Sequence, residues 1–252
     1  MNEKIKMDPG AASVLDALRR AGYKAYLVGG CVRDSLAGRA PHDWDICTSA
    51  RPEQTMAVFG EKHCIPTGLQ HGTVTVRQGG GFYEVTTFRV EGGYTDGRHP
   101  DRVDFVADVE ADLARRDFTI NAMAYNEAEG LIDPFGGRED LLVRRVVRAV
   151  GEPARRFEED GLRILRLYRF GAKEELALDP ATAAAALQER GRLGCVSAER
   201  IWQELYKLLS ARRPGRWMPP EILRQILPEL DGGAYPACIR AVDALPPDPL
   251  VR

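Results

Sequence analysis

Apolar and polar positions divide the chain into two parts that have different periods. In the first part, short apolar or alternating runs predict strands over residues 25–28, 42–47, 73–77 and 82–90. From residue 153 onward the strand signals vanish, and apolar residues recur every three or four positions, as on one face of a helix. We therefore expect an α+β head over residues 1–150, a mixed sheet with helices, followed by an all-helical second part over residues 151–252.

The same pattern places the helices. A helix is expected over residues 8–21, because Asp8 suits the N-cap and Pro9 suits the first helical position. In the second part, helical spacing predicts segments over residues 162–170, 181–187, 198–209 and 221–227. A proline-rich end, PPDPLVR, follows without a capped element. We expect the sequence to stop before its natural architecture is complete.

A polar run interrupts the first part. Residues 91–102 (EGGYTDGRHPDR) show neither a helical nor a strand period, and a strand pattern resumes with VDFV. We expect a mobile loop here.

Composition excludes several classes of protein. The five cysteines are odd in number and never spaced as CxxC, so neither a disulfide framework nor a zinc ribbon is indicated. No apolar run approaches the roughly 20 residues that span a membrane. We expect a soluble, cytoplasmic protein with no membrane association and no evident protein partner.

The charged residues indicate less about function than the cysteines and apolar runs do. The net charge of −2 argues against the broad basic surface of a nonspecific nucleic-acid binder. Arginine outnumbers lysine by 29 to 6, and arginine binds phosphates and base edges bidentately. A GC-rich genome would produce the same bias.

The segment HDWDIC carries the first candidate chemistry. In a strand, residues i and i+2 project from one face, so Asp43 and Asp45 would point the same way. Paired carboxylates suit Mg²⁺, which takes one or two carboxylates together with water and substrate phosphates. A DxD pair can equally be a solvated strand end.

Upstream and downstream residues support a phosphate site. Gly29 and Gly30 form a strand–turn–helix junction that lets phosphates approach backbone amides, and Arg33 can pair with their charge. Two metals about 3.5–4 Å apart could then activate a ribose hydroxyl and steady a leaving pyrophosphate. This chemistry requires a third carboxylate, for which Glu84 is the candidate; an exposed edge-strand charge is the alternative for Glu84.

Four motifs occur in a characteristic order: LVGGCVRDSLAGRAPHDWDI, RRDFTINAMAYN, LIDPFGG and EEDGLRILRLYRF. Together they resemble the motifs of the class II tRNA nucleotidyltransferase and bacterial poly(A) polymerase family, which includes the CCA-adding enzymes, over about residues 25–210. The resemblance implies a DNA polymerase beta-like head followed by a helical neck and part of a body. It also implies that Arg116 contacts the nucleotide and that Asp117 and Asn121 help recognise the ribose.

Base choice without a template can also be argued from the residues. Cytosine and adenine both present an amino donor beside a ring-nitrogen acceptor, whereas uracil and guanine present a carbonyl beside an N–H. Asp160 can accept from the amino group and Arg163 can donate to the ring nitrogen, as neighbours at i and i+3 on a helix; the resemblance implies the same role. Arg166 and Arg169 continue this series and would face triphosphate or tRNA backbone, or simply form a solvated basic face.

The resulting expectation is a template-independent nucleotidyltransferase that uses Mg²⁺ to add C and A from CTP and ATP to the 3′ end of tRNA. The loop at residues 91–102 speaks against a CC-adding branch, which typically lacks it. Two alternatives remain open, a poly(A) polymerase of the same family and a module that binds RNA or nucleotide without catalysis.

Overall fold

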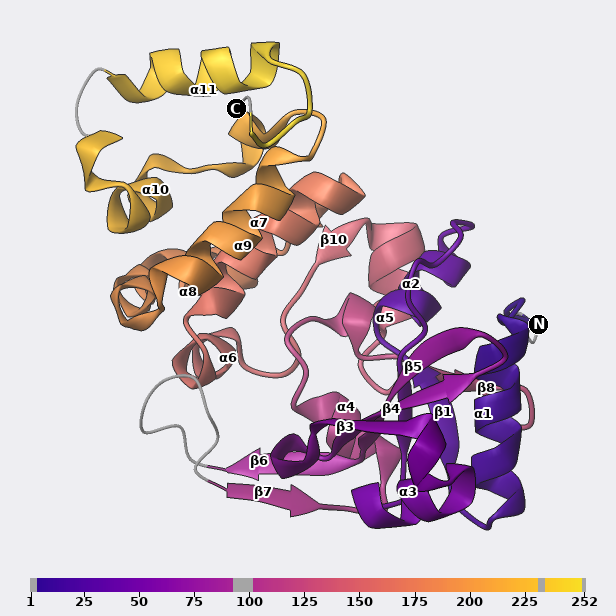
Figure 1. Cartoon of the computed structure of the whole chain (residues 1–252). Coiled ribbons are helices and arrows are strands. Elements are labelled where there is room, and N and C mark those ends of the chain that lie inside the picture. Colours follow the sequence, from indigo (N-terminus) through magenta and orange to yellow (C-terminus); the bar gives the residue numbers. More distant parts are fainter. Residues whose placement is uncertain (1–3, 93–101, 231–233, 251–252) are drawn as a thin grey trace. The chain divides into compact units, whose positions relative to one another are not determined.

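The computed structural model describes residues 4–92, 102–230 and 234–250 (Figure 1). These residues fall into two compact units, one ending at Val143 and the other beginning at Arg144, whereas we expected the boundary after residue 150. Within the described residues, no helix is long and apolar enough to cross a membrane.

The first unit is built on a seven-stranded sheet with the order β3-β4-β5-β2-β1-β8-β9. Its strands are β1 (Ala25–Val28), β2 (Ile46–Thr48), β3 (Cys64–Gly68), β4 (Thr73–Gln78), β5 (Gly81–Thr87), β8 (Ala124–Asn126) and β9 (Gly130–Ile132). Neighbours pair antiparallel, except that β2 and β5 are parallel. The central strands β1 and β2 are buried along their whole length, which explains their mainly apolar sequence. Their one threonine, Thr48, donates its hydroxyl to the Lys24 carbonyl at 2.7 Å.

Helices and short turns complete the first unit. They are α1 (Pro9–Arg20), α2 (Gly30–Leu36), α3 (Pro52–Phe59), η1 (Glu61–His63), η2 (Leu69–His71), α4 (Val109–Ala114), η3 (Thr119–Asn121), α5 (Gly137–Glu139) and η4 (Asp140–Arg144). The expected first helix is confirmed: Asp8 accepts hydrogen bonds from two backbone amides, and Pro9 opens α1. The buried face of α1 contacts β1 and β4.

Two expectations about the strands are wrong in detail. The strand expected from residue 42 begins only at Ile46. The strand expected over residues 82–90 is divided, because β5 ends at Thr87 and a separate antiparallel ribbon follows, formed by β6 (Arg89–Gly92) and β7 (Arg102–Phe105). The ends of the expected loop belong to these strands, and the rest of it lies outside the described residues.

The second unit is mainly helical. Its elements are β10 (Val146–Val147), α6 (Pro153–Glu159), α7 (Leu162–Glu174), β11 (Ala177–Leu178), α8 (Pro180–Gln188), η5 (Arg190–Cys195), α9 (Ala198–Leu209), η6 (Pro214–Trp217), α10 (Pro220–Ile226), η7 (Pro228–Leu230) and α11 (Ala234–Ala244). Helix α7 contacts α9, α6 and η6. All four helices expected here from the spacing are present.

Two features of this unit were not predicted from the sequence. A short parallel pair joins β10 to β11, so the part expected to be all-helical contains strand pairing. Helix α11 follows the segment we took for the last helix. Each strand of the pair has only two residues, too few for a period to be visible.

Candidate functional site

The paired aspartates lie just before β2 rather than within a strand. Asp43 is exposed and Asp45 is half-buried in the segment that leads into Ile46. The backbone still continues the sheet here, because the Val28 amide donates to the Asp45 carbonyl at 3.0 Å. The expectation that both side chains project from a regular strand is therefore wrong, since regular pairing with β5 starts one residue after Asp45.

Glu84 lies on a strand in the interior of the sheet. β5 sits between β4 and β2, so the alternative of an edge-strand charge is excluded. Ile46 pairs with Val85, and one step back along this parallel register brings Asp45 beside Glu84. Tyr83 and Val85 are buried, while Glu84 between them is exposed on the opposite face.

The three carboxylates interact electrostatically. Burial, together with the charges of Glu84 and Asp43, raises the pKa of Asp45 to about 6, against the opposing effect of Arg116. Among the residues that the structure describes, no three acidic, histidine or cysteine side chains are gathered closely enough to form a metal cage. The donor set nevertheless fits Mg²⁺, which takes one or two carboxylates and completes its shell with water and phosphate oxygens.

The glycine turn is closely packed against an arginine. Gly29 has φ +75°, and a Cβ there would lie 3.3 Å from Nη1 of Arg116. Asp112 is 1% exposed and accepts hydrogen bonds from Arg116 at 3.2 Å and from Arg115 at 2.8 Å. Asp112 therefore fixes the guanidinium beside the turn, and Arg115 is more than a surface charge.

A second network lies behind the turn. Arg33 is buried, and its Nη1 donates to Oδ1 of Asn121 at 2.7 Å. Asn121 donates in turn to Asp117 at 3.3 Å, and Arg33 also pairs with Asp34. The structure thus brings together Arg33, Asp117 and Asn121, although Arg33 is engaged by protein groups rather than presenting its whole fork to a phosphate.

The second unit holds the residues expected to read the base. Asp160 has an extended backbone (φ −153°, ψ 109°) between α6 and α7, so the expectation that it shares a helix face with Arg163 is wrong. Its Oδ1 accepts from the Leu162 amide at 3.0 Å, and Arg200 of α9 donates to Oδ2 at 2.7 Å and to Oδ1 at 3.3 Å. Arg163 donates to Glu159 at 2.7 Å.

The remaining two arginines of α7 differ from each other. Arg166 is one-third exposed and lies 3.8 Å from Glu204. Arg169 is buried, pairs with Glu204 and lies 3.8 Å above the ring of Phe170. The expectation that Arg169 faces bound phosphate or RNA backbone does not agree with this position, because its guanidinium packs inside the unit.

Three residues of these networks were missed from the sequence. Asp112, Arg200 and Glu204 each hold an arginine or aspartate that the motifs had singled out. Asp112 had a local signal, since it precedes the Arg115–Arg116 pair by one helical turn. Arg200 and Glu204 lie on another helix, so no spacing within a motif points to them.

Comparison with known proteins identifies two matching families. Residues 25–148 match the poly A polymerase head domain, and residues 175–232 match a probable RNA and SrmB-binding site of polymerase A. The CCA-adding enzyme of Lactobacillus delbrueckii subsp. bulgaricus is 50% identical over 198 residues, which are 79% of this chain and 49% of that protein. The CCA-adding enzyme of Geobacillus stearothermophilus is 47% identical over 209 residues, or 83% of this chain and 51% of that protein.

Solved structures agree with these matches. A crystal structure of the Bacillus stearothermophilus CCA-adding enzyme in complex with CTP superposes with a TM-score of 0.81 at 43% identity, covering 94% of this chain and 58% of that one. The Thermotoga maritima CCA-adding enzyme complexed with tRNA_CCA gives a TM-score of 0.71 at 25% identity, covering 87% and 52% respectively. The chain spans about half the length of the curated relatives it matches.

Proposed function

We propose, from the premise that this chain belongs to the class II tRNA nucleotidyltransferase and bacterial poly(A) polymerase family, that it transfers C and A from CTP and ATP to the 3′ end of tRNA without a template. In this reaction the terminal 3′ oxygen attacks the α-phosphorus, the bond to the bridging oxygen of the β-phosphate breaks, and pyrophosphate leaves. One observation carries the proposal: Asp45 and Glu84 lie on adjacent parallel chain segments, and their charges act on each other.

The carboxylates supply the metal ligands. Asp43 and Asp45 would hold Mg²⁺, and Glu84 would contribute from β5. When bound, Mg²⁺ favours the deprotonated 3′ hydroxyl and neutralises the leaving pyrophosphate. The raised pKa of Asp45 supports this role, because a carboxylate that is costly to ionise alone gains most from a neighbouring cation.

Nucleotide binding falls to the residues around the glycine turn. Gly29 and Gly30 let the triphosphate approach the backbone, and Arg116, held by Asp112, faces it. The buried chain Arg33–Asn121–Asp117 forms a rigid wall for the ribose.

Base selection falls to Asp160 and Arg163. Their neighbours Arg200 and Glu159 fix them before the base arrives, which lowers the entropic cost of recognition. Arg166, which is one-third exposed, would contact phosphate or RNA backbone, whereas Arg169 has a packing role.

The proposal is tested by incorporation of labelled CTP and ATP, separately and together with Mg²⁺, into tRNA ending at the discriminator base, at C and at CC. Addition to all three ends would establish CCA addition, and ATP addition only to the CC end would establish A addition. Long adenylate tails on unrelated RNA would instead indicate the poly(A) polymerase of the same family. Absence of any incorporation would leave a binding module and contradict the proposal for this chain.

A further inference from the structure

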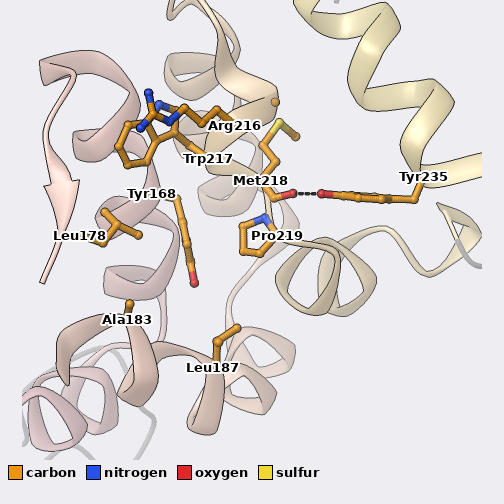
Figure 2. A pocket seen from close by; sticks show the side chains of 10 residues that line it. Tyr168, Leu178, Ala183, Leu187, Arg216, Trp217, Met218, Pro219 and Tyr235 are labelled. Carbon is orange, nitrogen blue, oxygen red and sulfur yellow. Dashed lines mark hydrogen bonds between the residues drawn. The ribbon is translucent and has the colours of Figure 1, made fainter. Parts of the chain in front are cut away.

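A cavity of about 240 Å³ lies in the second unit, and none of the residues assigned above lines it (Figure 2). Its wall is mainly aromatic and aliphatic, with contributions from Tyr168, Leu178, Leu187, Trp217, Met218 and Tyr235. Pockets that hold a whole small molecule are usually about 300–1,000 Å³. This cavity therefore suits a single planar ring rather than a complete ligand.

One polar group, the hydroxyl of Tyr168, borders this cavity and remains accessible to solvent there. Tyr168 is 5% exposed, and its hydroxyl makes no hydrogen bond with any residue that the structure describes. Figure 2 shows this hydroxyl directed toward the side of the pocket where Ala183 and Leu187 lie. Burial, together with the charge of Glu221, raises the Tyr168 pKa to about 12, so the group stays a neutral donor and acceptor. Because no described protein group occupies this hydroxyl, a ligand atom in the cavity could form a hydrogen bond with it.

A second hollow of about 480 Å³ shares two of its lining residues, Arg216 and Trp217, with the first. Arg212 and Arg213 also line it, and Glu175 is the acidic residue there. Arg213 and Arg216 are exposed, and neither forms an ion pair with a described residue. Guanidinium groups in excess over carboxylates favour phosphate, which they bind through paired hydrogen bonds.

We propose that the joined hollows bind a nucleotide unit, with its base ring in the aromatic cavity, where the Tyr168 hydroxyl bonds an edge atom, and its phosphate at Arg213 and Arg216. Trp217 lies between the two subsites, and Arg216 stacks 5.3 Å from the centre of its ring. The unit could belong to an RNA strand or be a free nucleotide. The RNA source rests on the proposed function, whereas the site itself does not.

The chain contains its own reporters for this test. Its three tryptophans are Trp44, between the metal-binding aspartates, Trp202, exposed on α9, and Trp217 in the proposed site. In protein labelled with 5-fluorotryptophan, each gives one ¹⁹F resonance, assigned by single Trp→Phe variants. Titration with CMP, AMP and a single-stranded hexacytidylate should shift the Trp217 resonance saturably; a shift with the mononucleotides assigns a free nucleotide, and a shift with the oligonucleotide alone assigns RNA.

Substitutions separate the two subsites. Tyr168→Phe keeps the ring and should raise the dissociation constant read at Trp217 by about three- to tenfold, because one hydrogen bond is lost. Arg213→Ala should raise it by about tenfold and lower the salt dependence of oligonucleotide binding by about one phosphate contact. Arg240→Ala, which removes an exposed arginine of α11 outside both hollows, should change neither quantity.

Two results would overturn the inference: a Trp217 resonance that fails to shift with any of the three ligands, or a shift whose affinity is unchanged by both Tyr168→Phe and Arg213→Ala. Either result leaves the proposed function intact if Mg²⁺-dependent incorporation proceeds and the Trp44 resonance responds to CTP with Mg²⁺. Conversely, a responsive Trp217 without incorporation supports the site and contradicts the proposed function.

Discussion

Asp45 is held where its negative charge is disfavoured, and this has a measurable effect on stability. Its folded pKa is about 6, above the roughly 3.9 of an unfolded aspartate. The folded state therefore binds more protons between these values, and stability falls as pH rises from about 4 to 6. Above pH 6 the cost is fully present, up to about 3 kcal/mol for a shift of this size.

We therefore predict that Asp45→Asn is more stable than the parent chain at pH 8 without Mg²⁺, by up to about 3 kcal/mol, and that the difference closes toward pH 4. Urea unfolding at pH 4, 6 and 8 measures this. Asp16→Asn, at an exposed carboxylate on α1, serves as the control and should show no comparable trend. The same Asp45→Asn variant should lose incorporation, and full residual turnover would contradict the proposed metal role.

The base-reading pair gives a prediction about selectivity. Asp160→Ala combined with Arg163→Ala removes both the acceptor and the donor. The preference for CTP and ATP over UTP and GTP should therefore decrease. Competition between labelled nucleotides measures the ratio. A comparison with Arg200→Gln is informative, since this change leaves Asp160 in place but removes its bidentate partner. Unchanged selectivity in the double variant would place base recognition elsewhere.

Among individual residues, the sequence predicted which candidate residues lie near one another better than it predicted their surroundings. Asp45 and Glu84 do lie on neighbouring segments, although their alignment depends on a parallel register that no local pattern encodes. Arg169 shows the limit of spacing arguments. Its position on α7 suggested an outward cation, but Glu204 on α9 makes burial of that charge tolerable.

At the scale of elements, the packing of helix α7 depends on Gly171, whose missing side chain leaves room for Trp217 and Leu178. A Cβ at Gly171 would lie 2.7 Å from ring carbons of Trp217 and 2.9 Å from Leu178. Overpacking of this kind costs about 1–3 kcal/mol, while replacing glycine by alanine within a helix recovers only about 1 kcal/mol.

We expect Gly171→Ala to lower the free energy of unfolding by up to about 2 kcal/mol net, since the cost of the clash outweighs the gain in helix propensity. Denaturant unfolding provides the measurement. Gly194→Ala is a matched control, because a Cβ there meets no atom within 4 Å. If the two variants had the same free energy of unfolding, the Trp217 side chain would have moved to admit the new methyl group without destabilising the fold.

Helices α7 and α9 are also joined by a buried ion pair, between Arg169 and Glu204. Glu204→Leu should destabilise by about 3–5 kcal/mol, because it removes the carboxylate that pairs with the buried Arg169, and adding Arg169→Met should recover most of that loss. Lys207→Ala, which removes a half-exposed cation 3.9 Å from the same glutamate, should cost less than about 1 kcal/mol. Failure of the second substitution to rescue would mean that packing, not charge, links these helices.

Element types followed from periodicity, whereas element boundaries did not. All four expected helices of the second unit are present because each repeats apolar positions over several turns. β2 is half as long as expected because the residues before Ile46 leave the regular ladder. The β10–β11 pair depends on residues far apart in the chain, which no window of the sequence compares.

At the scale of the whole chain, net charge bears on RNA affinity. The chain carries a net charge of −2, and it spans about half the length of the curated relatives it matches. We predict that it binds tRNA at least about tenfold more weakly at physiological salt than the full-length Geobacillus stearothermophilus enzyme, because fewer phosphate contacts are available. Filter binding of both proteins to one tRNA measures the ratio, and equal affinities would contradict the prediction.

The parallel pairing of β2 with β5 also bears on the order of events during synthesis. A ribosome delivers Asp43 and Asp45 first, and α3, β3 and β4 must all emerge before Glu84 follows on β5. Until then a nascent chain offers magnesium only two carboxylates, on a segment that can pair with β1 but not yet with β5. In the proposed function the ion therefore joins a finished sheet and does not guide its assembly. Under magnesium depletion we therefore expect this protein to fold but to incorporate no nucleotide.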